Sequence, residues 1–143
     1  MKKNKKILVT GVAGFLGSHL AEKLTSLGYE VVGIDNMIGG YADNIPKNIE
    51  FHNIDCCDLK QVKQIIKNVE VVYHCAATAH EGLSVFSPCE ITKNNYLASI
   101  SIFTAAINEK VKRIIYCSSM ARYGDSNPPF TENSKPKPVD PYA

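Results

Sequence analysis

Thr10–Gly17, with the sequence TGVAGFLG, follows a short apolar run and precedes a leucine-rich segment. A strand, a glycine-rich turn and a helix in this order are typical of the unit that binds a dinucleotide in Rossmann-like folds. Gly11 permits the tight turn, Gly14 leaves space for a phosphate, and Gly17 lets the helix pack closely on the strand. The glycines alone would also suit a plain loop, so their position between strand and helix is what supports the prediction.

The residues around this turn indicate which dinucleotide is bound. Phe15 and Leu16 open the helix, whose free backbone N–H groups and partial positive charge would hold the pyrophosphate. Asp35 stands where the second strand ends, so its carboxylate can accept hydrogen bonds from the adenosine ribose hydroxyls and would repel a 2′-phosphate. NAD is therefore favoured over NADP. Asp55 ends the third strand and could meet the adenine amino group. For both aspartates the alternative is an ordinary role in a turn.

Short apolar runs alternate with helical patterns along most of the chain. Several runs are apolar at consecutive positions, as expected for strands buried on both faces. Helices are predicted over residues 16–27, 59–66 and 88–108, and strands over Ile7–Thr10, Val31–Ile34, Ile49–Ile54, Val69–Cys75 and Val111–Cys117. The alternation indicates an α/β fold with a Rossmann-like, doubly wound parallel sheet of about five strands.

The predicted helix over residues 88–108 is apolar on nearly every side. Its two apolar faces consist of Ile91, Ala98, Ile102 and Ala105, and of Leu97, Ile100, Phe103 and Ile107. A helix of this kind must be covered on both sides. The sheet can cover one side, and the other side needs a further domain or a partner chain. The alternative is a helix wholly buried in its own domain.

Composition excludes several kinds of partner. The 143 residues fit one domain, and four of the 16 basic residues lie within the first six positions, where we expect a solvated tail. The remainder is slightly acidic, which argues against nucleic-acid binding. The apolar run before Thr10 is too short for a signal peptide, and no stretch approaches the ~18 apolar residues of a membrane span. The five cysteines lack the spacing of zinc or redox sites, so we predict no metal and a cytoplasmic location.

Further motifs make the whole chain resemble the N-terminal part of the extended short-chain dehydrogenase/reductases, in particular the NAD-dependent nucleotide-sugar epimerases and dehydratases. The glycines have the G-x-x-G-x-x-G spacing of that family. By this resemblance, Asp35-Asn36 would bind ribose and Asp55-Cys56 would lie near adenine. Cys75-Ala76-Ala77 would let the cofactor lie against the backbone, and Asn95 falls at the position of an asparagine near the cofactor.

The same resemblance assigns two catalytic residues. Ser118–Gly124, with the sequence SSMARYG, resembles the fifth-strand motif of the family, in which Ser119 would be the catalytic serine. Pro141-Tyr142 resembles the start of the Y-x-x-x-K motif, in which Tyr142 would be the base. Oxidation of a sugar hydroxyl by NAD needs a base to remove the hydroxyl proton, and the serine would order the substrate oxygen. The alternatives are a strand-end serine that satisfies the backbone and a simple loop tyrosine.

Met120 and Ala121 limit the reactions that the chain is expected to catalyse. The 4,6-dehydratases that the chain resembles carry an Asp-Glu pair at these positions, and the decarboxylases carry a Glu where Ala121 stands. Neither side chain present can move a proton, which leaves 4-epimerisation or simple keto-reduction of a nucleotide sugar. We expect an epimerase similar to UDP-glucose 4-epimerase. Arg122 departs from the family, which more often has an apolar residue there.

Two classes of function stay open. Residues 1–126 are predicted to form the NAD-binding domain, and residues 127–143 a proline-rich loop that leads to the tyrosine motif. By the resemblance, a lysine is expected four positions after Tyr142, past the last of these residues, and the C-terminal substrate domain of the family is expected to be missing from them. The chain is expected to be the N-terminal part of an epimerase-type oxidoreductase or isomerase, or a stand-alone nucleotide-binding module without catalysis. In the family the helix over 91–107 pairs with its copy, which predicts a homodimer.

Overall fold

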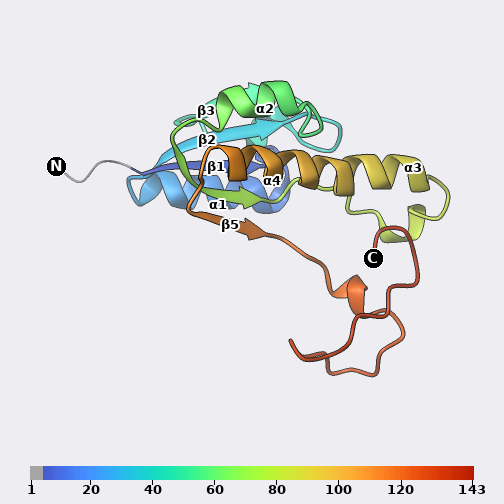
Figure 1. Cartoon of the computed structure of the whole chain (residues 1–143). Helices are drawn as coiled ribbons and strands as arrows, with labels where there is room; N and C mark the ends of the chain where they lie inside the picture. The colour runs from blue at the N-terminus through green and yellow to red at the C-terminus, as the bar shows by residue number, and fades with distance from the viewer. Residues whose placement is uncertain (1–4) are drawn as a thin grey trace.

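Five parallel strands form the sheet in the computed structural model, which describes residues 5–143. They are β1 (Lys6–Thr10), β2 (Glu30–Asp35), β3 (Glu50–Asn53), β4 (Val69–His74) and β5 (Arg113–Tyr116). Their order across the sheet is β3-β2-β1-β4-β5 (Figure 1). This is the strand order of a Rossmann fold, so the predicted fold class is confirmed. The third, fourth and fifth strands are shorter than predicted.

Helices cover both faces of the sheet because alternate side chains of the strands supply two separate cores. Leu8 of β1 packs in one core with Val62 of α2 (Leu59–Ile65) and Ile102 of α4 (Ala98–Asn108). The neighbouring β1 residues Ile7 and Val9 pack on the opposite face with Ala21 and Leu24 of α1 (Phe15–Ser26). The two-residue period of a strand thus produces the layered arrangement.

The limits of the first two helices follow from local chemistry. At the start of α2, the Asp58 carboxylate accepts a hydrogen bond from the Gln61 backbone N–H at 3.0 Å, which confirms the predicted N-cap. After α1, Gly28 adopts a φ of +83° and its N–H donates to the Thr25 carbonyl at 2.9 Å. A left-handed residue at this point ends the helix, as the glycine predicted.

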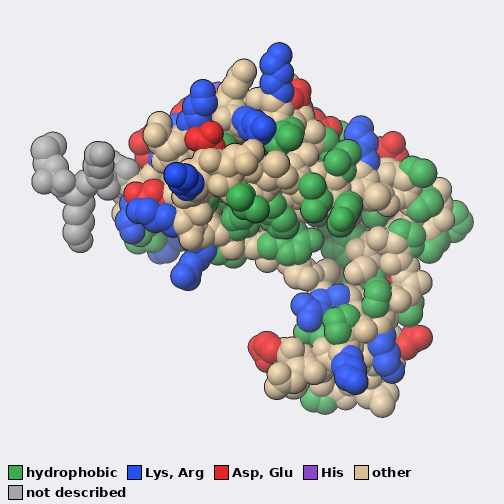
Figure 2. All heavy atoms as spheres, in the orientation of Figure 1, with side chains coloured by type: hydrophobic (Ala, Val, Ile, Leu, Met, Phe, Trp, Pro, Cys, Tyr) green, Lys and Arg blue, Asp and Glu red, His purple; other side chains and the backbone are tan. Residues whose placement is uncertain are grey.

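The long helix differs from the expected regular α-helix. It consists of α3 (Pro88–Ile91), a π-helical turn (Thr92–Leu97) and α4 in direct succession. One face is buried, but Leu97, Ile100 and Ile107 are 48%, 42% and 72% exposed. The alternative of a helix wholly buried in its own domain is therefore wrong for this chain. Figure 2 shows hydrophobic side chains gathered along this helix.

The segment after β5 runs away from the sheet (Figure 1). A short 3₁₀ turn (Met120–Tyr123) follows the strand. From residue 124 to 143 the backbone forms neither helix nor strand, which agrees with the predicted irregular loop over 127–143. In the described part of the chain, residues 5–143, no helix has the length and apolar character needed to cross a bilayer.

The N-terminal lysines are only partly the solvated tail that composition suggested. Lys2 and Lys3 lie outside the described residues, and Lys5 is exposed. Lys6, however, is the first residue of β1, and its Nζ lies 3.2 Å from a carboxylate oxygen of Glu50 and 3.8 Å from one of Glu30. Because β1, β2 and β3 are parallel and adjacent in the sheet, their first residues lie along one edge, where Lys6 reaches the acidic residues at the starts of β2 and β3.

Candidate dinucleotide site

The glycine turn is tightly packed at Gly11 and Gly17 and borders open space at Gly14. The Gly11 N–H donates to the Ile34 carbonyl of β2 at 2.9 Å, and its φ is +69°. A Cβ on Gly11 would lie 2.8 Å from the Ala76 nitrogen, and one on Gly17 would lie 2.1 Å from the Gly11 oxygen. A Cβ on Gly14 would meet only the Gly11 oxygen, at 3.3 Å. Gly11 and Gly17 are thus required for packing, while Gly14 borders open space.

The N-terminus of α1 is available to an anion. Its N-cap residue, Gly14, provides no side-chain hydrogen bond, and its first turn contains no acidic residue. The first N–H groups of a helix have no partner within the helix, so here they remain free to bind a ligand. Phe15 and Leu16, the residues that carry the first of these groups, are 83% and 54% exposed.

A cavity of about 280 Å³ lies beside this turn. It brings together most of the residues that the sequence predicted for cofactor binding, namely Gly11, Gly14, Asp35, Asn36, Asp55, Cys56, Cys75, Ala76 and Ala77. Phe15, Leu16, Gly17 and Asn95 do not line it. The glycine turn provides a place for phosphate, and the small residues around Ala76 form a wall without large side chains. Asp35 and Asp55 provide hydrogen-bond acceptors for hydroxyl or amino groups.

Both aspartates also have the turn role that was the alternative. The Asp35 carboxylate is 8% exposed and accepts hydrogen bonds from the Ala13 N–H at 3.0 Å and the Met37 N–H at 2.8 Å, one on each oxygen. Asp55 accepts one from the Cys57 N–H at 2.8 Å. A carboxylate has about four acceptor positions, so each side chain keeps capacity for a ligand. Holding a turn and binding a ligand are compatible here.

Asn95 does not line the 280 Å³ cavity itself, but its side chain binds Thr78, which does. Its Oδ1 accepts a hydrogen bond from the Thr78 N–H at 2.7 Å and its Nδ2 donates to the Thr78 carbonyl at 3.3 Å. Its neighbour Asn94 donates to the Thr78 hydroxyl at 3.1 Å, and Asn94 and Thr78 line the 280 Å³ cavity. The π-helical turn lets two consecutive asparagines hold the loop after β4, and this kind of turn is frequent at functional sites.

A smaller cavity, of about 70 Å³, contains the two predicted catalytic residues. Ser119 and Tyr142 line it together with Asn95, and it shares Ala76 and Ala77 with the larger cavity. The Ser119 hydroxyl oxygen accepts a hydrogen bond from the Ala121 N–H at 3.2 Å. Its own proton is therefore still free to be donated to a ligand. The structure brings the serine and the tyrosine to one place although 23 positions separate them.

Arg122 also lines the smaller cavity. Its Nε is buried and has no hydrogen-bond partner within residues 5–143. The guanidinium carbon lies 4.8 Å from the centre of the Tyr123 ring, a cation–π arrangement. A cation therefore occupies a position where the resembling family more often has an apolar side chain.

The cysteines near the site are held in the thiol form. Burial raises the pKa of Cys56 to about 12, that of Cys75 to about 12 and that of Cys57 to about 11. The Sγ atoms of Cys75 and Cys117 are in contact at 3.6 Å. Because the thiolate is the form that attacks substrates and binds metals, these side chains suit packing better than catalysis. Residues 5–143 contain no group of three His, Cys, Asp or Glu side chains arranged to hold a metal ion.

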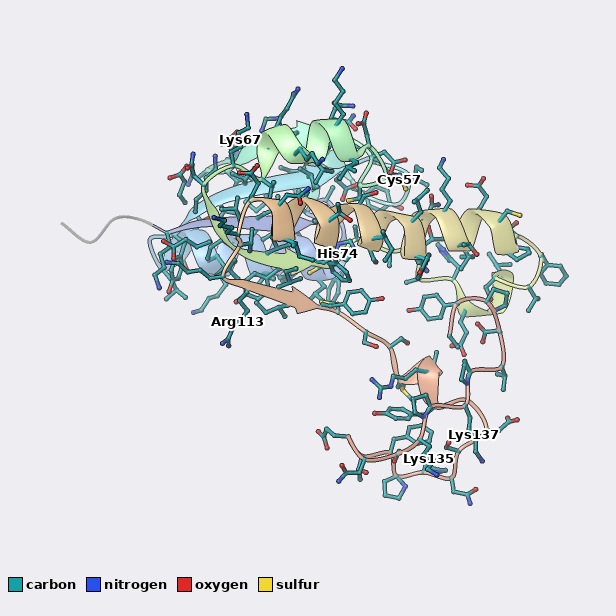
Figure 3. All side chains as sticks on the ribbon, in the orientation of Figure 1. Cys57, Lys67, His74, Arg113, Lys135 and Lys137 are labelled. Atoms are coloured by element: carbon teal, nitrogen blue, oxygen red, sulfur yellow. The ribbon has the colours of Figure 1, made fainter. Side chains whose placement is uncertain are left out.

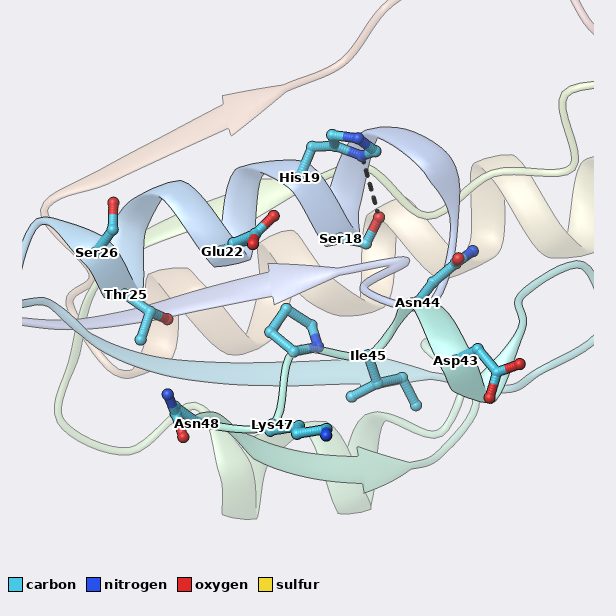
Figure 4. A pocket seen from close by; sticks show the side chains of 11 residues that line it. Ser18, His19, Glu22, Thr25, Ser26, Asp43, Asn44, Ile45, Lys47 and Asn48 are labelled. Carbon is cyan, nitrogen blue, oxygen red and sulfur yellow. Dashed lines mark hydrogen bonds between the residues drawn. The ribbon is translucent and has the colours of Figure 1, made fainter.

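A third cavity, of about 580 Å³, lies apart from these residues (Figure 4). It is formed by the outer side of α1, from Ser18 to Ser26, and by the segment Asp43–Asn48. None of the residues predicted for cofactor binding or catalysis lines it. Size alone is therefore a poor guide to the site in this molecule.

Some residues that line the 280 Å³ cavity were not predicted from the sequence. The loop after Asp35 folds over the glycine turn, because the Tyr41 N–H donates to the Ala13 carbonyl at 3.0 Å and a Cβ on Gly40 would lie 2.6 Å from the Ala13 Cβ. This loop contributes Ile38, Gly39 and Gly40 to the larger cavity, and the loop after β4 contributes Thr78, Ala79 and His80. The pair Gly39-Gly40 was the available signal for a close backbone approach.

Comparisons with known proteins agree with the geometry. The family model described as the NAD dependent epimerase/dehydratase family matches residues 7–143. A putative UDP-glucose 4-epimerase of Methanocaldococcus jannaschii is 39% identical over 139 residues, which cover 95% of this chain and 46% of that protein. A UDP-N-acetyl-alpha-D-glucosaminuronate decarboxylase of Bacillus cytotoxicus is 33% identical over 132 residues, which cover 90% of this chain and 41% of that protein.

Solved structures give the same result. The UDP-glucose 4-epimerase of Thermotoga maritima, determined with UDP-glucose, has a TM-score of 0.92 and 34% identity over 96% of this chain and 46% of its own. That of Brucella ovis, in complex with NAD, has a TM-score of 0.91 and 32% identity over 96% of this chain and 43% of its own. The chain spans less than half the length of these relatives.

Proposed function

Because this chain belongs to the NAD-dependent epimerase/dehydratase family, we propose that it forms the NAD-binding part of a UDP-sugar 4-epimerase. One observation carries the proposal. A single cavity is lined by the glycines before the uncapped N-terminus of α1 and by the carboxylates of Asp35 and Asp55. These are the groups that a pyrophosphate and an adenosine require, in that order.

The division of the chain follows from this assignment. Residues 1–126 hold the cofactor, and residues 127–143 carry Tyr142 to the smaller cavity. The 4-epimerase structures that resemble this chain include complexes with NAD and with UDP-glucose. The substrate is accordingly a nucleotide sugar whose reacting carbon enters the smaller cavity. We place the protein in the cytoplasm, since all five of its cysteines are free.

Ser119 and Tyr142 have complementary roles in the proposed reaction. NAD, when bound, supplies the hydride acceptor and donor for chemistry at carbon 4 of the sugar. Tyr142 takes the proton of the 4-hydroxyl as the base and later returns it. Ser119 donates its hydroxyl proton in a hydrogen bond to the same oxygen, while its own oxygen accepts from the Ala121 N–H. The serine thereby fixes the oxygen in line for proton transfer.

Decarboxylation is the less favoured chemistry although one relative is a decarboxylase. Ala121 stands where the decarboxylases that the chain resembles have a glutamate, and it is 9% exposed with a methyl side chain that cannot transfer a proton. The neighbouring Met120 lacks an ionisable group as well. Epimerisation needs no further acid at these positions, so it agrees better with the residues present.

The self-association that we propose uses the exposed face of the long helix. Leu97, Ile100 and Ile107 together form an apolar surface over residues 97–107, and Phe103 between them is half-buried. A second copy of the same face is its occupant in this proposal, which gives a homodimer.

Cofactor binding is tested by titrating the protein with NAD and NADP in a calorimeter. NAD is expected to bind, with NADP weaker by at least about tenfold because Asp35 repels the 2′-phosphate. Asp35→Asn removes a charged acceptor, so NAD should bind at least about tenfold more weakly. The control Asp43→Asn alters an exposed acidic residue that does not line the 280 Å³ cavity, and it should leave NAD affinity unchanged. Equal affinity of the wild type for both cofactors, or none for NAD, contradicts the proposal.

Catalysis is tested separately, in the natural polypeptide that carries these residues, by following the interconversion of UDP-glucose and UDP-galactose. Tyr142→Phe is expected to lower turnover by about a hundredfold or more, the contribution of a general base, with NAD affinity nearly unchanged. Turnover that survives this change would assign the base to another residue.

A further inference from the structure

Two backbone N–H groups at the floor of the 280 Å³ cavity lie just beyond the end of the β1–β4 pairing and have no partner in a neighbouring strand. The β1 strand ends at Thr10, and Gly11 turns toward β2, while the chain of β4 continues past the end of its neighbour. The N–H groups of Cys75 and Ala76 therefore face no strand. Both donate instead to the Thr10 hydroxyl oxygen, at 3.1 and 3.0 Å. Thr10 itself is fully buried.

These bonds determine where the protons of a buried chain of side chains lie. A hydroxyl oxygen can accept two hydrogen bonds and donate one. Since the Thr10 oxygen already accepts two, its proton must be donated to His74 Nδ1, which lies 2.7 Å away. The proton of a neutral ring is then on Nε2, which donates to the Ser99 hydroxyl at 2.9 Å. The Ser99 hydroxyl donates in turn to the Asn95 carbonyl at 2.5 Å.

The surroundings of His74 favour a neutral ring. The side chain is 1% exposed and lies between β4 and α4 (Figure 3). Its ring packs against those of Phe103 and Tyr116, each with centroids 5.8 Å away. Burial lowers the pKa of His74 to about 4. Its hydrogen-bonding partners are two hydroxyl groups and no carboxylate.

The chain of hydrogen bonds joins Thr10 and Asn95, which are far apart in the sequence and hold neighbouring parts of the cavity. At one end, Thr10 holds the Cys75-Ala76 floor beneath the glycine turn. At the other end, the Asn95 side chain holds both backbone groups of Thr78 in the cavity wall. His74 is the link between the sheet and the π-helical turn.

We propose that His74 is a positioning residue for the dinucleotide: as a neutral ring with its proton on Nε2, it fixes Thr10 under the floor of the cavity and, through Ser99, the π-helical turn beside Thr78. The assignment rests on the proposed function in naming NAD as the ligand. His74 lines neither the 280 Å³ cavity nor the 70 Å³ cavity, so it acts through Thr10 and Ser99.

The tautomer can be observed without any ligand. Long-range ¹H–¹⁵N spectra of the labelled protein report the protonation of each ring nitrogen, and His74→Gln identifies which of the four histidine patterns belongs to this residue. We expect an unprotonated Nδ1 and a protonated Nε2 near neutral pH. A proton on Nδ1, or a charged ring, overturns the proposal.

A matched pair of variants tests the positioning role. Thr10→Val keeps the shape of the side chain and removes the hydroxyl, while Thr10→Ser keeps the hydroxyl. NAD affinity is expected to fall by about tenfold or more in the valine variant, because the Cys75 and Ala76 N–H groups lose their buried acceptor. In the serine variant the affinity should stay within about twofold of the wild type. Circular dichroism shows whether the valine variant folds. If it does not, the same comparison is made on the other side of His74, where Ser99→Ala removes the hydroxyl and Ser99→Thr keeps it. Unchanged NAD affinity in the folded variant without the hydroxyl overturns the proposal.

The two proposals fail in different ways. If the wild type shows the Nε2–H tautomer but does not bind NAD, the proposed cofactor is wrong. If the wild type binds NAD and the loss of the Thr10 or Ser99 hydroxyl has no effect on affinity, the cofactor stands and the role of His74 is wrong.

Discussion

The sulfur atoms of Cys75 and Cys117 lie 3.6 Å apart, one residue beyond the last pair of the β4–β5 ladder, His74 and Tyr116. Cys75 lines the larger cavity and Cys117 the smaller one, so the two thiols stand between the proposed cofactor and substrate positions. Burial raises the pKa of Cys75 to about 12, which keeps it in the thiol form at neutral pH.

Alkylation should report this arrangement. Iodoacetamide reacts with the thiolate, so at pH 7 it is expected to modify the exposed Cys89 well before Cys75. The rate at Cys75 should rise as the pH is raised toward 9, and saturating NAD should slow it without affecting Cys89. Peptide mass spectrometry over a time course measures both rates. Equal rates at the two cysteines near neutral pH would show that Cys75 is not protected.

Gly17→Ala is expected to destabilise the protein. The added Cβ would lie 2.1 Å from the Gly11 oxygen, so the helix or the turn must move, at a cost of about 1–3 kcal/mol in the free energy of unfolding. Urea denaturation measures this cost. The control is Gly82→Ala, where a Cβ would have no neighbour within 4 Å; its effect should stay within about 0.5 kcal/mol. Equal stability of the two variants would mean that the close contact at Gly17 is not present in solution.

Acidification should remove stability through His74. The pKa of its ring is about 4 in the folded chain, below its usual 6.5, because burial disfavours the charged form. Between these values the unfolded chain binds more protons than the folded one, so stability falls as the pH drops from about 6.5 and the loss is complete below the folded pKa. The loss attributable to His74 is about 3 kcal/mol.

The difference between the wild type and His74→Gln isolates this effect. Urea unfolding of both proteins from pH 7 to pH 4 should show the wild type losing more stability than the variant. Hydrogen bonds to His52 and Gln61 lower the pKa values of Glu50 and Asp58. Protonation of these two carboxylates also lowers the stability of the protein on acidification, but it does so equally in the wild type and the variant. A difference that does not change with pH would mean that His74 takes up a proton freely when folded.

Ile100→Lys is expected to convert the proposed homodimer into a monomer. A charge in the middle of an apolar interface leaves a buried cation without a partner, which opposes association. Sedimentation equilibrium measures the mass. The control is Leu27→Lys, which places the same charge at another exposed apolar position, at the end of α1. A wild type that stays monomeric at the highest concentration tested would refute the interface.

The fold was predictable because local signals and burial agree. Gly11 and Gly17 mark positions where a Cβ would collide with the backbone. Runs such as Ile7–Val9 are apolar because both faces of the sheet are covered. The π-helical turn at Thr92–Leu97 was not predictable, since a single extra residue barely alters the spacing of apolar positions. The pairing of Lys6 with Glu50 was missed because it depends on strand order.

The candidate site was predictable where a motif defines it and not where distant residues meet. Asp35 ends β2 and Ala76 follows β4, at positions that the resemblance specified, and both line the 280 Å³ cavity. The bond between Thr10 and His74 joins residues 64 positions apart, and only the β1–β4 pairing brings them together. Polar residues at the ends of apolar strands were the available signal for it.

The π-helical turn also constrains how this chain can change. Such a turn amounts to one residue inserted into an α-helix, and each residue of an α-helix occupies about 100° around its axis. Deleting one residue between Thr92 and Leu97 would restore a regular helix and rotate the preceding turn by that angle. The segment from Pro88 would then face a different direction, and Asn94 and Asn95 could no longer both reach Thr78. A change in the length of this segment would therefore displace both asparagines at once, whereas a single substitution would remove at most one of them.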